Sequence, residues 1–271
     1  NSASGNNRNA IFLASCALTG TSILNDEIPY YVSYPNVLQG AQLQIQAGAI
    51  VKIVNQITVN GTLVSEGTAA EPVYITSYKD DSVGGDTNGD GDATSPAPGD
   101  WYHIQIGDGV TATFDHTVIR YGGAYSSSYA KGNIWAPHSS TVVVRDCEIS
   151  YAYESGISMN SSSATAPYTA TLTVERSTIA NNGSLGIYMV ADNDPQGHNS
   201  LSISDSTIRD NGQDGIQVNR VLMLEVVGNA FDNNGIYALE LSSSEIDLSH
   251  IHSNSASGNN RNAIFLASCA L

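Results

Sequence analysis

The chain has 271 residues, of which 41% are apolar and 13% charged, so it has enough apolar sequence for a sizeable core in a single domain. Its 26 acidic residues against ten Lys and Arg give a formal net charge of -16, which argues against nucleic acid or an anionic membrane surface as a partner and favours a cation-rich, extracellular setting. No run of eighteen apolar residues is present, so we expect no membrane insertion.

The first 18 residues of the chain, NSASGNNRNAIFLASCAL, are identical to residues 254–271. An identity of this length indicates internal repetition, and the offset from Asn1 to Asn254 gives a period of 253 residues (254 minus 1). We therefore expect residues 1–271 to form a single domain that spans one period and the start of the next. The two copies should then occupy equivalent positions in a continuous array.

Residues 19–79 contain short apolar runs separated by glycines, a pattern that predicts short β-strands joined by turns. The segment from Thr19 to Pro35, which contains two prolines, is expected to connect the first copy of the repeat to these strands. The separating glycines are Gly40, Gly48, Gly61 and Gly67.

An acidic insertion, residues 80–100, follows these strands. Asp86, Asn88, Asp90 and Asp92 occupy positions one, three, five and seven of a calcium loop, with a glycine at position six, where the chain must turn sharply. Alternate residues of a tightly wound loop direct their oxygen atoms toward one point, and a hard cation requires oxygen ligands. The spacing therefore predicts a Ca2+ site in preference to a flexible acidic loop.

The same motif resembles the DxNxDGD calcium loops of EF-hands, dockerins and thrombospondin type 3 repeats. It departs from the EF-hand at position twelve, where Ala97 replaces the bidentate glutamate. We expect Asp100 to supply the missing carboxylate, with Asp80 and Asp81 as the alternatives.

From Thr111 to the last residue the chain repeats one template. Two apolar residues five positions apart recur six times, and in four of these units a further apolar residue follows eight positions after the second. In the first and sixth units an insertion is expected to displace that residue to Ile134 and Ile264. The pairs are Phe114/Ile119, Val144/Ile149, Val174/Ile179, Ile203/Ile208, Val226/Phe231 and Ile246/Ile251, and the residues that follow are Ile157, Ile187, Ile216 and Leu239.

Each repeat unit is too short to bury its own apolar face, so it must stack on its neighbours. Leu172 and Val174 alternate with polar residues, which is the periodicity of a strand. We therefore predict an all-β, single-stranded parallel β-helix (β-solenoid) of about ten rungs at ~24 residues per rung, with the acidic loop as an insertion. Asparagines three positions after the second apolar residue are predicted to form a ladder of amide hydrogen bonds, and these are Asn182, Asn211, Asn234 and Asn254.

Charged residues favour the same register, because Asp115, Arg145 and Glu175 would lie one above the other with alternating sign. Over residues 111–271 the pattern resembles the right-handed parallel β-helix repeat family, which includes pectate-lyase-like folds and tandem-repeat proteins that are secreted or displayed on cell surfaces. The resemblance implies a right-handed coil, and it raises a polysaccharide lyase or hydrolase as an activity to test.

Two functions remain open. The first is a structural repeat unit of an extracellular filament, sheath or surface adhesin, which binds copies of itself end to end as a calcium-stabilised β-solenoid. The second is a secreted glycan-binding or polysaccharide-degrading β-helix protein. Its candidate glycan face is the pair Tyr121 and Tyr151, near Trp101, Tyr125, Tyr129 and Trp135 in the sequence, but for these aromatic residues we favour a role in the core or in stabilising the rungs. We favour the structural function and expect no enzymatic activity, because Arg145 and Arg176 are predicted to pair with acidic neighbours and the sequence marks no pair of catalytic carboxylates.

Overall fold

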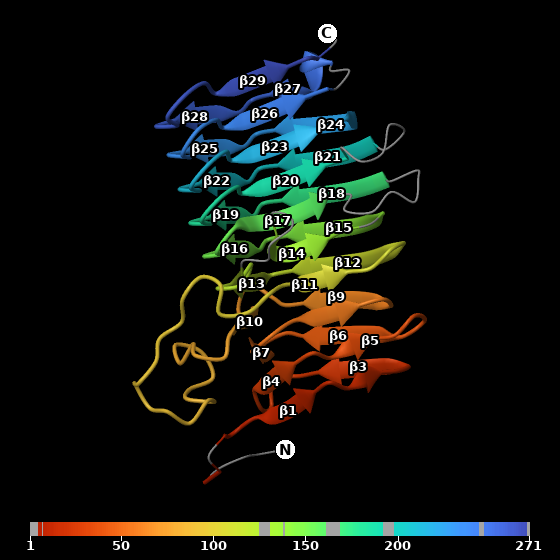
Figure 1. Ribbon diagram of the computed structural model, residues 1–271, viewed down its shortest axis with the longest axis vertical. Coiled ribbons are helices and arrows are strands. Elements are labelled where there is room, and N and C mark those ends of the chain that lie inside the picture. Colours follow the sequence, from red (N-terminus) through yellow and green to blue (C-terminus); the bar gives the residue numbers. More distant parts are fainter. Residues whose placement is uncertain are drawn as a thin grey trace.

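The structure, a computed structural model, describes residues 5–6, 8–124, 131–137, 139–160, 169–191, 198–243 and 247–269. These residues form an elongated parallel β-helix whose strands lie in three sheets, here named A, B and C (Figure 1). Within the described ranges, sheets A and B contain ten strands each and sheet C contains nine. The predicted all-β solenoid of about ten rungs is therefore confirmed.

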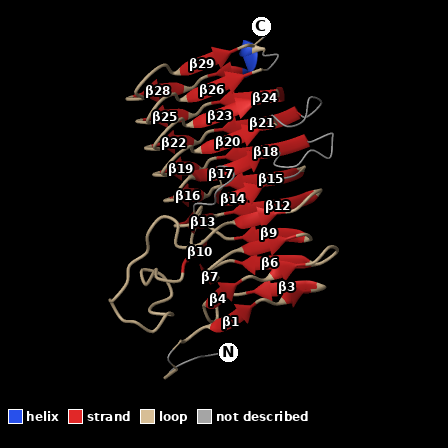
Figure 2. Cartoon of the chain, in the orientation of Figure 1, coloured by secondary structure: helices blue, strands red, loops and turns tan. Residues whose placement is uncertain are grey.

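The chain passes through the three sheets in turn, and each strand pairs in parallel with its counterpart one rung later (Figure 2). Sheet A consists of β1 (Ile11–Ala14), β4 (Tyr30–Ser33), β7 (Ile50–Ile53), β10 (Val73–Ser77), β13 (Thr117–Arg120), β16 (Glu148–Ser150), β19 (Thr178–Ala180), β22 (Thr207–Arg209), β25 (Ala230–Asp232) and β28 (Ser255–Ser257). Sheet B consists of β2 (Ala17–Leu18), β5 (Asn36–Val37), β8 (Ile57–Val59), β11 (Ile104–Ile106), β14 (Gly132–Ala136), β17 (Ser155–Asn160), β20 (Ile187–Val190), β23 (Ile216–Asn219), β26 (Leu239–Ser242) and β29 (Ile264–Ala267).

Sheet C consists of β3 (Thr21–Leu24), β6 (Gln42–Gln46), β9 (Thr62–Glu66), β12 (Val110–Asp115), β15 (Ser140–Arg145), β18 (Thr169–Glu175), β21 (His198–Ser204), β24 (Val221–Val227) and β27 (Ile251–His252). The only helical element in the described part of the chain is the 3₁₀-helix η1 (Leu248–His250). No described helix has the length and apolar character that crossing a bilayer would require.

Inward-facing side chains stack directly on their counterparts in neighbouring rungs. Phe114, Val144 and Val174 are register partners in sheet C, and all three are 0% exposed. The residues predicted to follow eight positions later stack in the same way in sheet B, where Ile157 pairs with Ile187. Because an inward residue leaves water only when the neighbouring rungs cover it, the rungs stabilise one another.

In the last repeat unit the pair of apolar residues lies five positions later than predicted. Ile251 lies in β27 of sheet C, so it is the first apolar residue of its unit and not the second. Ala256 in β28 is the second, and Ile264 follows it by eight positions without an insertion. The predicted pair Ile246/Ile251 was wrong because the spacing of these two isoleucines equals that of the template, and Ile246 itself lies outside the described residues.

An asparagine ladder runs along the corner between sheets A and B. The side-chain amide of Asn182 donates to Oδ1 of Asn211 at 2.9 Å. The same bond joins Asn211 to Asn234 at 3.0 Å and Asn234 to Asn259 at 2.9 Å. The second Nδ2 bond of each residue goes to a backbone carbonyl, so the ladder satisfies buried amides at a turn that leaves the regular sheets.

Asn254 belongs to a second ladder, at the corner between sheets C and A, and not to the first as predicted. Its Oδ1 accepts the side-chain amide of Asn229 at 3.1 Å, and further along this corner Ser206 and Ser177 accept the backbone N–H of the preceding rung. This difference has the same origin as the shifted apolar pair. Asn254 follows Ile251, the first apolar residue of the unit, by three positions, whereas Asn259 follows Ala256, the second, by three.

The two copies of the 18-residue sequence lie in different sheets. Ile11–Ala14 forms β1 in sheet A and pairs with Tyr30–Ser33, whereas the identical Ile264–Ala267 forms β29 in sheet B and pairs with Leu239–Ser242. The copies are therefore not equivalent in register, contrary to expectation. In the first copy the next strand, Ala17–Leu18, lies in sheet B, so the strand before it, Ile11–Ala14, occupies sheet A.

Candidate metal centre and surface groove

The acidic insertion leaves the helix after β10 and returns before β11, and it lies beside sheet A (Figure 1). Arg120 on β13 anchors its beginning, because Nη2 of Arg120 donates to Oδ2 of Asp80 at 2.7 Å and to Oγ of Ser82 at 2.8 Å. At the other end Trp101 is 1% exposed, and its indole N–H donates to the carbonyl of Arg120 at 3.0 Å. One arginine residue therefore fixes both ends of the insertion to the helix.

Asp80 is an ionised structural anchor. Burial on its own raises the pKa of Asp80, but hydrogen bonds from Ser82, Thr76 and Arg120 outweigh burial and hold that pKa below its ordinary value. Both of its carboxylate oxygens already accept hydrogen bonds. Asp80 therefore stabilises the insertion, and it is not one of the three carboxylates that converge further along it.

A buried lysine lies beneath the insertion. Lys52 on β7 is 0% exposed, its Nζ donates to the carbonyl of Gly85, and it lies 3.8 Å from Oδ1 of Asp81. Burial lowers the pKa of Lys52, and the charge of Asp81 acts against that shift. Because an ammonium group out of water needs such partners, Lys52 and the insertion depend on one another. Sequence reasoning missed this residue because lysines are expected at the surface.

Three carboxylates converge in the insertion. Asp81, Asp86 and Asp90 each offer an oxygen that lies within 4.8 Å of the other two. The carboxylate of Asp86 accepts the backbone N–H groups of Gly89 at 2.6 Å and Gly91 at 2.8 Å, so the loop winds around it. These hydrogen bonds, that of Gly91 first, lower the pKa of Asp86, whereas burial raises the pKa of Asp81.

Several oxygens of this turn are shielded from solvent and accept no hydrogen bond. They are Oδ1 of Asn88, Oδ1 of Asp90 and Oδ1 of Asp81, of which only the last has a charged neighbour, the Lys52 ammonium group at 3.8 Å. The other carboxylate oxygen of Asp90 accepts the amide of Asn88 at 2.9 Å and the hydroxyl of Thr94 at 2.6 Å. An acceptor buried without a donor costs ~1–3 kcal/mol, and a bound cation would remove that cost. The residues present therefore fit a hard, oxygen-binding ion such as Ca2+.

The predicted ligands divide into two groups. Asp86, Asn88 and Asp90 come together in this turn, and of the three candidates for the missing carboxylate the structure adds Asp81. Asp92 is not part of the three-carboxylate group. The predicted turn is thus assembled from the first three positions of the motif and from a residue that precedes it.

Asp100 has a structural position instead of the predicted ligand position. Its carboxylate accepts the ammonium group of Lys79 at 2.7 Å, the hydroxyl of Ser77 at 2.6 Å and the backbone N–H of Ala97 at 2.9 Å. These contacts close the base of the insertion against β10 and engage both carboxylate oxygens. Asp100 was predicted to supply the carboxylate that is missing at position twelve of the calcium loop, but in the structure it binds Lys79, Ser77 and the backbone of Ala97 instead.

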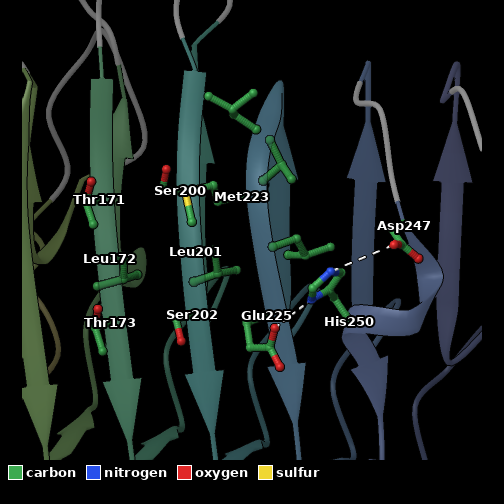
Figure 3. A pocket seen from close by; sticks show the side chains of 13 residues that line it. Thr171, Leu172, Thr173, Ser200, Leu201, Ser202, Met223, Glu225, Asp247 and His250 are labelled. Carbon is green, nitrogen blue, oxygen red and sulfur yellow. Dashed lines mark hydrogen bonds and ion pairs between the residues drawn. The ribbon is translucent and has the colours of Figure 1, made fainter.

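A groove with a volume of about 800 Å³ lies on the outer face of sheet C. It crosses β18, β21 and β24, and Figure 3 shows Thr171, Thr173, Ser200 and Ser202 along it. These side chains lie in register, with Thr171 beside Ser200 and Thr173 beside Ser202. The floor of the groove therefore presents two rows of hydroxyl groups.

An extra residue in β24 builds the apolar side of the groove. Asn199 pairs with Val221, but the next residue, Ser200, pairs with Met223, so Leu222 is additional to the ladder. The extra residue interrupts the in–out alternation of the strand. Leu222 is 65% exposed and Met223 is 68% exposed, and together they form an apolar ridge. The unbroken apolar run at the start of β24 is the sequence signal that could have revealed it.

A histidine between two carboxylates lines the same groove (Figure 3). Nδ1 of His250, in η1, lies 2.8 Å from Oε2 of Glu225 on β24, and Nε2 lies 3.8 Å from Oδ2 of Asp247. The hydrogen bond with Glu225 raises the pKa of His250. These groups can donate and accept hydrogen bonds at the edge of the apolar ridge.

The aromatic residues considered for a glycan face lie apart from the groove. Tyr121 and Tyr151 stack at the corner between sheets A and B, with ring centroids 5.5 Å apart and an interplanar angle of 21°. Trp101 is buried, and Tyr125 and Tyr129 lie outside the described residues. The tyrosine pair is thus on a different corner from the groove.

Comparisons with known proteins bear on the fold. The family model described as "Right handed beta helix region" matches residues 100–198 and 134–270. A crystal structure of a mutant of the periplasmic alginate epimerase AlgG is similar, with a TM-score of 0.40 and 11% identity over 97% of this chain and 77% of that chain. A crystal structure of AlgG without a stated mutation has a TM-score of 0.39, 11% identity and the same coverage, 97% and 77%. None of the curated protein sequences matches the chain.

Proposed function

We propose that this chain, which belongs to the right-handed β-helix region family, is an extracellular glycan-binding protein that holds a carbohydrate chain in the groove of sheet C. The observation that supports this most is the groove itself, which joins two rows of hydroxyl groups to an exposed apolar ridge. Carbohydrates present hydroxyl edges and apolar ring faces, so they require both kinds of surface in one site.

The charges around the groove favour an uncharged glycan. Glu225 and Asp247 are the acidic residues that line it, and His250 is the basic one. The net charge of the chain, -16, adds a negative field that repels polyanions. We therefore expect a neutral polysaccharide whose hydroxyl groups donate to these carboxylates.

We propose binding without catalysis. Two arginines beside the sheet C strands are already paired, since Arg145 lies 3.2 Å from Glu175 and Arg176 lies 2.7 Å from Asp146. A polysaccharide lyase would need a free base and free cations for an acidic substrate, so lyase or hydrolase activity is the alternative that an activity screen would test.

Calcium would have a structural role in this proposal. Asp81, Asp86, Asn88 and Asp90 would hold Ca2+, and the ion would satisfy the oxygens of the turn that accept no hydrogen bond. By lowering the charge repulsion among three carboxylates, it would order the insertion against sheet A and leave the groove of sheet C untouched.

The groove proposal is tested by titration calorimetry with neutral oligosaccharides of increasing length. The variant Leu222→Ser/Met223→Ser should bind about tenfold more weakly or worse, because each lost apolar contact is worth ~1–3 kcal/mol. Ile23→Ser is the matched control, since Ile23 is 52% exposed on β3 of the same sheet and lies outside the groove. Equal affinities for the ridge variant and the native chain would contradict the proposal.

A second function is favoured by the repeated 18-residue sequence, namely a structural unit of an extracellular filament, sheath or adhesin that associates end to end. Negative-stain electron microscopy with and without EDTA tests it. Long uniform rods would support the structural function, and short monodisperse particles at high concentration would exclude it while leaving the glycan proposal intact.

A further inference from the structure

A small pocket lies between the two limbs of the acidic insertion and the β-helix. It has a volume of about 250 Å³, and we name it the insertion pocket. One limb contributes residues 79–82 to its lining, the other limb contributes Asp92 and residues 94–96, and Tyr121 contributes from the helix. None of these residues lines the groove of sheet C, so the insertion pocket is a separate site.

The insertion pocket borders the turn that would hold calcium. Asp81 lines the pocket, and one of its carboxylate oxygens lies within 4.8 Å of oxygens of Asp86 and Asp90. Thr94 also lines the pocket, and its hydroxyl donates to the carboxylate of Asp90 at 2.6 Å. An ion held by this turn would therefore lie beside the pocket, since Asp81 belongs to both.

The turn supplies fewer oxygens than calcium takes. Ca2+ binds about six to eight oxygens, and the bidentate carboxylate that an EF-hand places at position twelve is missing because that position is Ala97. Of the side chains in the turn, Asp86 already accepts backbone hydrogen bonds on both oxygens, and Asp90 accepts hydrogen bonds on one. A bound ion would thus keep open coordination positions, and the adjacent pocket is the space from which a ligand could fill them.

Other groups of the insertion pocket suit a sugar ring. The carboxylate of Asp92 makes no hydrogen bond or ion pair within the part of the chain that the structure describes, and Ser95 offers a hydroxyl group. Tyr121 adds an aromatic wall, and its ring is held in place by stacking on Tyr151. A sugar needs hydrogen-bond acceptors for its hydroxyl groups and an apolar or aromatic surface for its ring, and the pocket provides both.

The charges of the insertion pocket favour a neutral ligand. Among the described residues that line it, Lys79 is the basic one, and its ammonium group already donates to Asp100 at 2.7 Å. Asp81, Asp92 and the net charge of -16 would repel a ligand carboxylate. A ligand ammonium group has no lone pair with which to bind a metal ion. Hydroxyl oxygens carry no charge and can bind calcium, so they meet both requirements.

We propose that the insertion pocket binds a neutral sugar through two adjacent hydroxyl groups, which complete the coordination of the Ca2+ held by the turn. Tyr121 packs against the sugar ring, and Asp92 accepts a hydrogen bond from a further hydroxyl group. The inference rests on the proposed metal centre and not on the groove of sheet C. Because the ion and the sugar bind one another in this site, each raises the affinity of the chain for the other by the same factor.

Titration calorimetry on the full chain tests this site with the methyl glycosides of glucose, mannose, galactose and fucose. We expect at least one of them to bind in calcium and to bind at least about tenfold more weakly in EDTA. A deoxy analogue of that sugar, which lacks one of the two adjacent hydroxyl groups, should show a similar loss. Failure of all four sugars to bind in calcium, or equal binding in EDTA, would overturn the proposal.

Variants separate the two sites. Asp92→Ala should weaken sugar binding about tenfold, because a hydrogen bond to a charged group is lost, and should leave the affinity for calcium alone unchanged. Asp108→Ala, at an exposed aspartate outside the insertion, is the matched control. The ridge variant Leu222→Ser/Met223→Ser should bind the methyl glycoside like the native chain. Loss of binding in the ridge variant but not in Asp92→Ala would place the sugar in the groove and overturn this inference alone.

Terbium luminescence provides a readout that does not depend on affinity. Tb3+ replaces Ca2+ in oxygen sites, and its luminescence lifetimes in H2O and D2O count the water molecules bound to the ion. The sugar should displace about two of them, one for each hydroxyl group that enters the coordination shell. An unchanged water count would overturn the proposal and leave the metal centre intact, whereas failure of the chain to bind the ion would overturn both.

Discussion

The rungs from β15 to β26 and the acidic insertion are stabilised in opposite ways. In the rungs the inward side chains and the ladder asparagines have counterparts in neighbouring rungs, so the same interaction recurs many times. The insertion depends on interactions that occur once, chiefly those of Arg120, Lys52 and Trp101. The rungs should therefore respond to changes in packing, and the insertion to changes in ions and pH.

Removal of a stacked core side chain should produce the largest effect. Ile179 is 0% exposed between its register partners Ile149 and Ile208, so Ile179→Ala should lower the free energy of unfolding by ~2–5 kcal/mol. Urea titration measures it. Ser95→Ala, at an exposed position of the insertion, should change stability by less than ~0.5 kcal/mol. Similar losses of unfolding free energy for Ile179→Ala and Ser95→Ala would contradict the inference that core packing stabilises the rungs and not the insertion.

Calcium should stabilise the chain only through binding to the insertion. If the ion binds there, calcium at 100 times its dissociation constant should stabilise the chain by ~2.7 kcal/mol, and EDTA should remove that gain. Differential scanning calorimetry should show a Tm that rises with calcium in the native chain and in Asp92→Ala, but not in Asp90→Ala. A Tm that EDTA does not change would contradict the proposed metal centre.

Alanine substitution should lower the free energy of unfolding more in the middle of the asparagine ladder than at its end. Asn211→Ala removes the short acceptor of the Asn182 amide and the side-chain donor to Oδ1 of Asn234, and leaves these buried groups only longer bonds of 3.5 and 3.4 Å, so we expect a loss of ~1–3 kcal/mol in denaturant titration. Asn259→Ala removes only one ladder bond at a half-buried site, so its loss should be smaller. A neutral effect of Asn211→Ala would mean that the ladder does not stabilise the corner.

Acid should release the insertion before it unfolds the rungs. The pKa of Asp80 is lower in the folded chain than its unfolded value of about 3.9, so its stabilising contribution is complete above that pH and is lost as the pH falls through the folded pKa. Limited proteolysis by pepsin should therefore cut within residues 80–100 first. Arg120→Met should make this cleavage begin at a higher pH, and a native chain cut first in the rungs would contradict the order.

The repetitive half of the fold could be predicted because its signal is redundant. Val144, Val174 and Ile203 mark the same inward position in successive units, so one ambiguous residue does not change the register. At the last unit the redundancy ends, and Ile251 could be taken for either member of the apolar pair. That ambiguity displaced the predicted ladder residue from Asn259 to Asn254.

The sites were harder to predict because they depend on single interactions. The DxNxDG spacing placed Asp86, Asn88 and Asp90 in one turn, but it could not show that Lys79 engages Asp100 or that Asp81 lies near the turn. The groove depends on one additional residue in β24, which only the pairing with β21 makes visible.

The ladder between sheets C and A shows how this fold tolerates changes in length. The sequence separation of successive ladder partners varies, being 30, 29, 23 and 25 residues, while their hydrogen bonds stay at 3.1, 3.0, 2.9 and 2.9 Å. The number of residues differs between the end of a sheet B strand and the start of the next sheet C strand. The connection from Asn160 to Thr169 is long, for example, and the one from Asn219 to Val221 is short. The corner between sheets B and C borders the groove, so segments beside the groove can differ in length without altering the pitch of the helix. If the groove binds a glycan as proposed, its specificity can be changed by grafting at this corner while the scaffold stays the same.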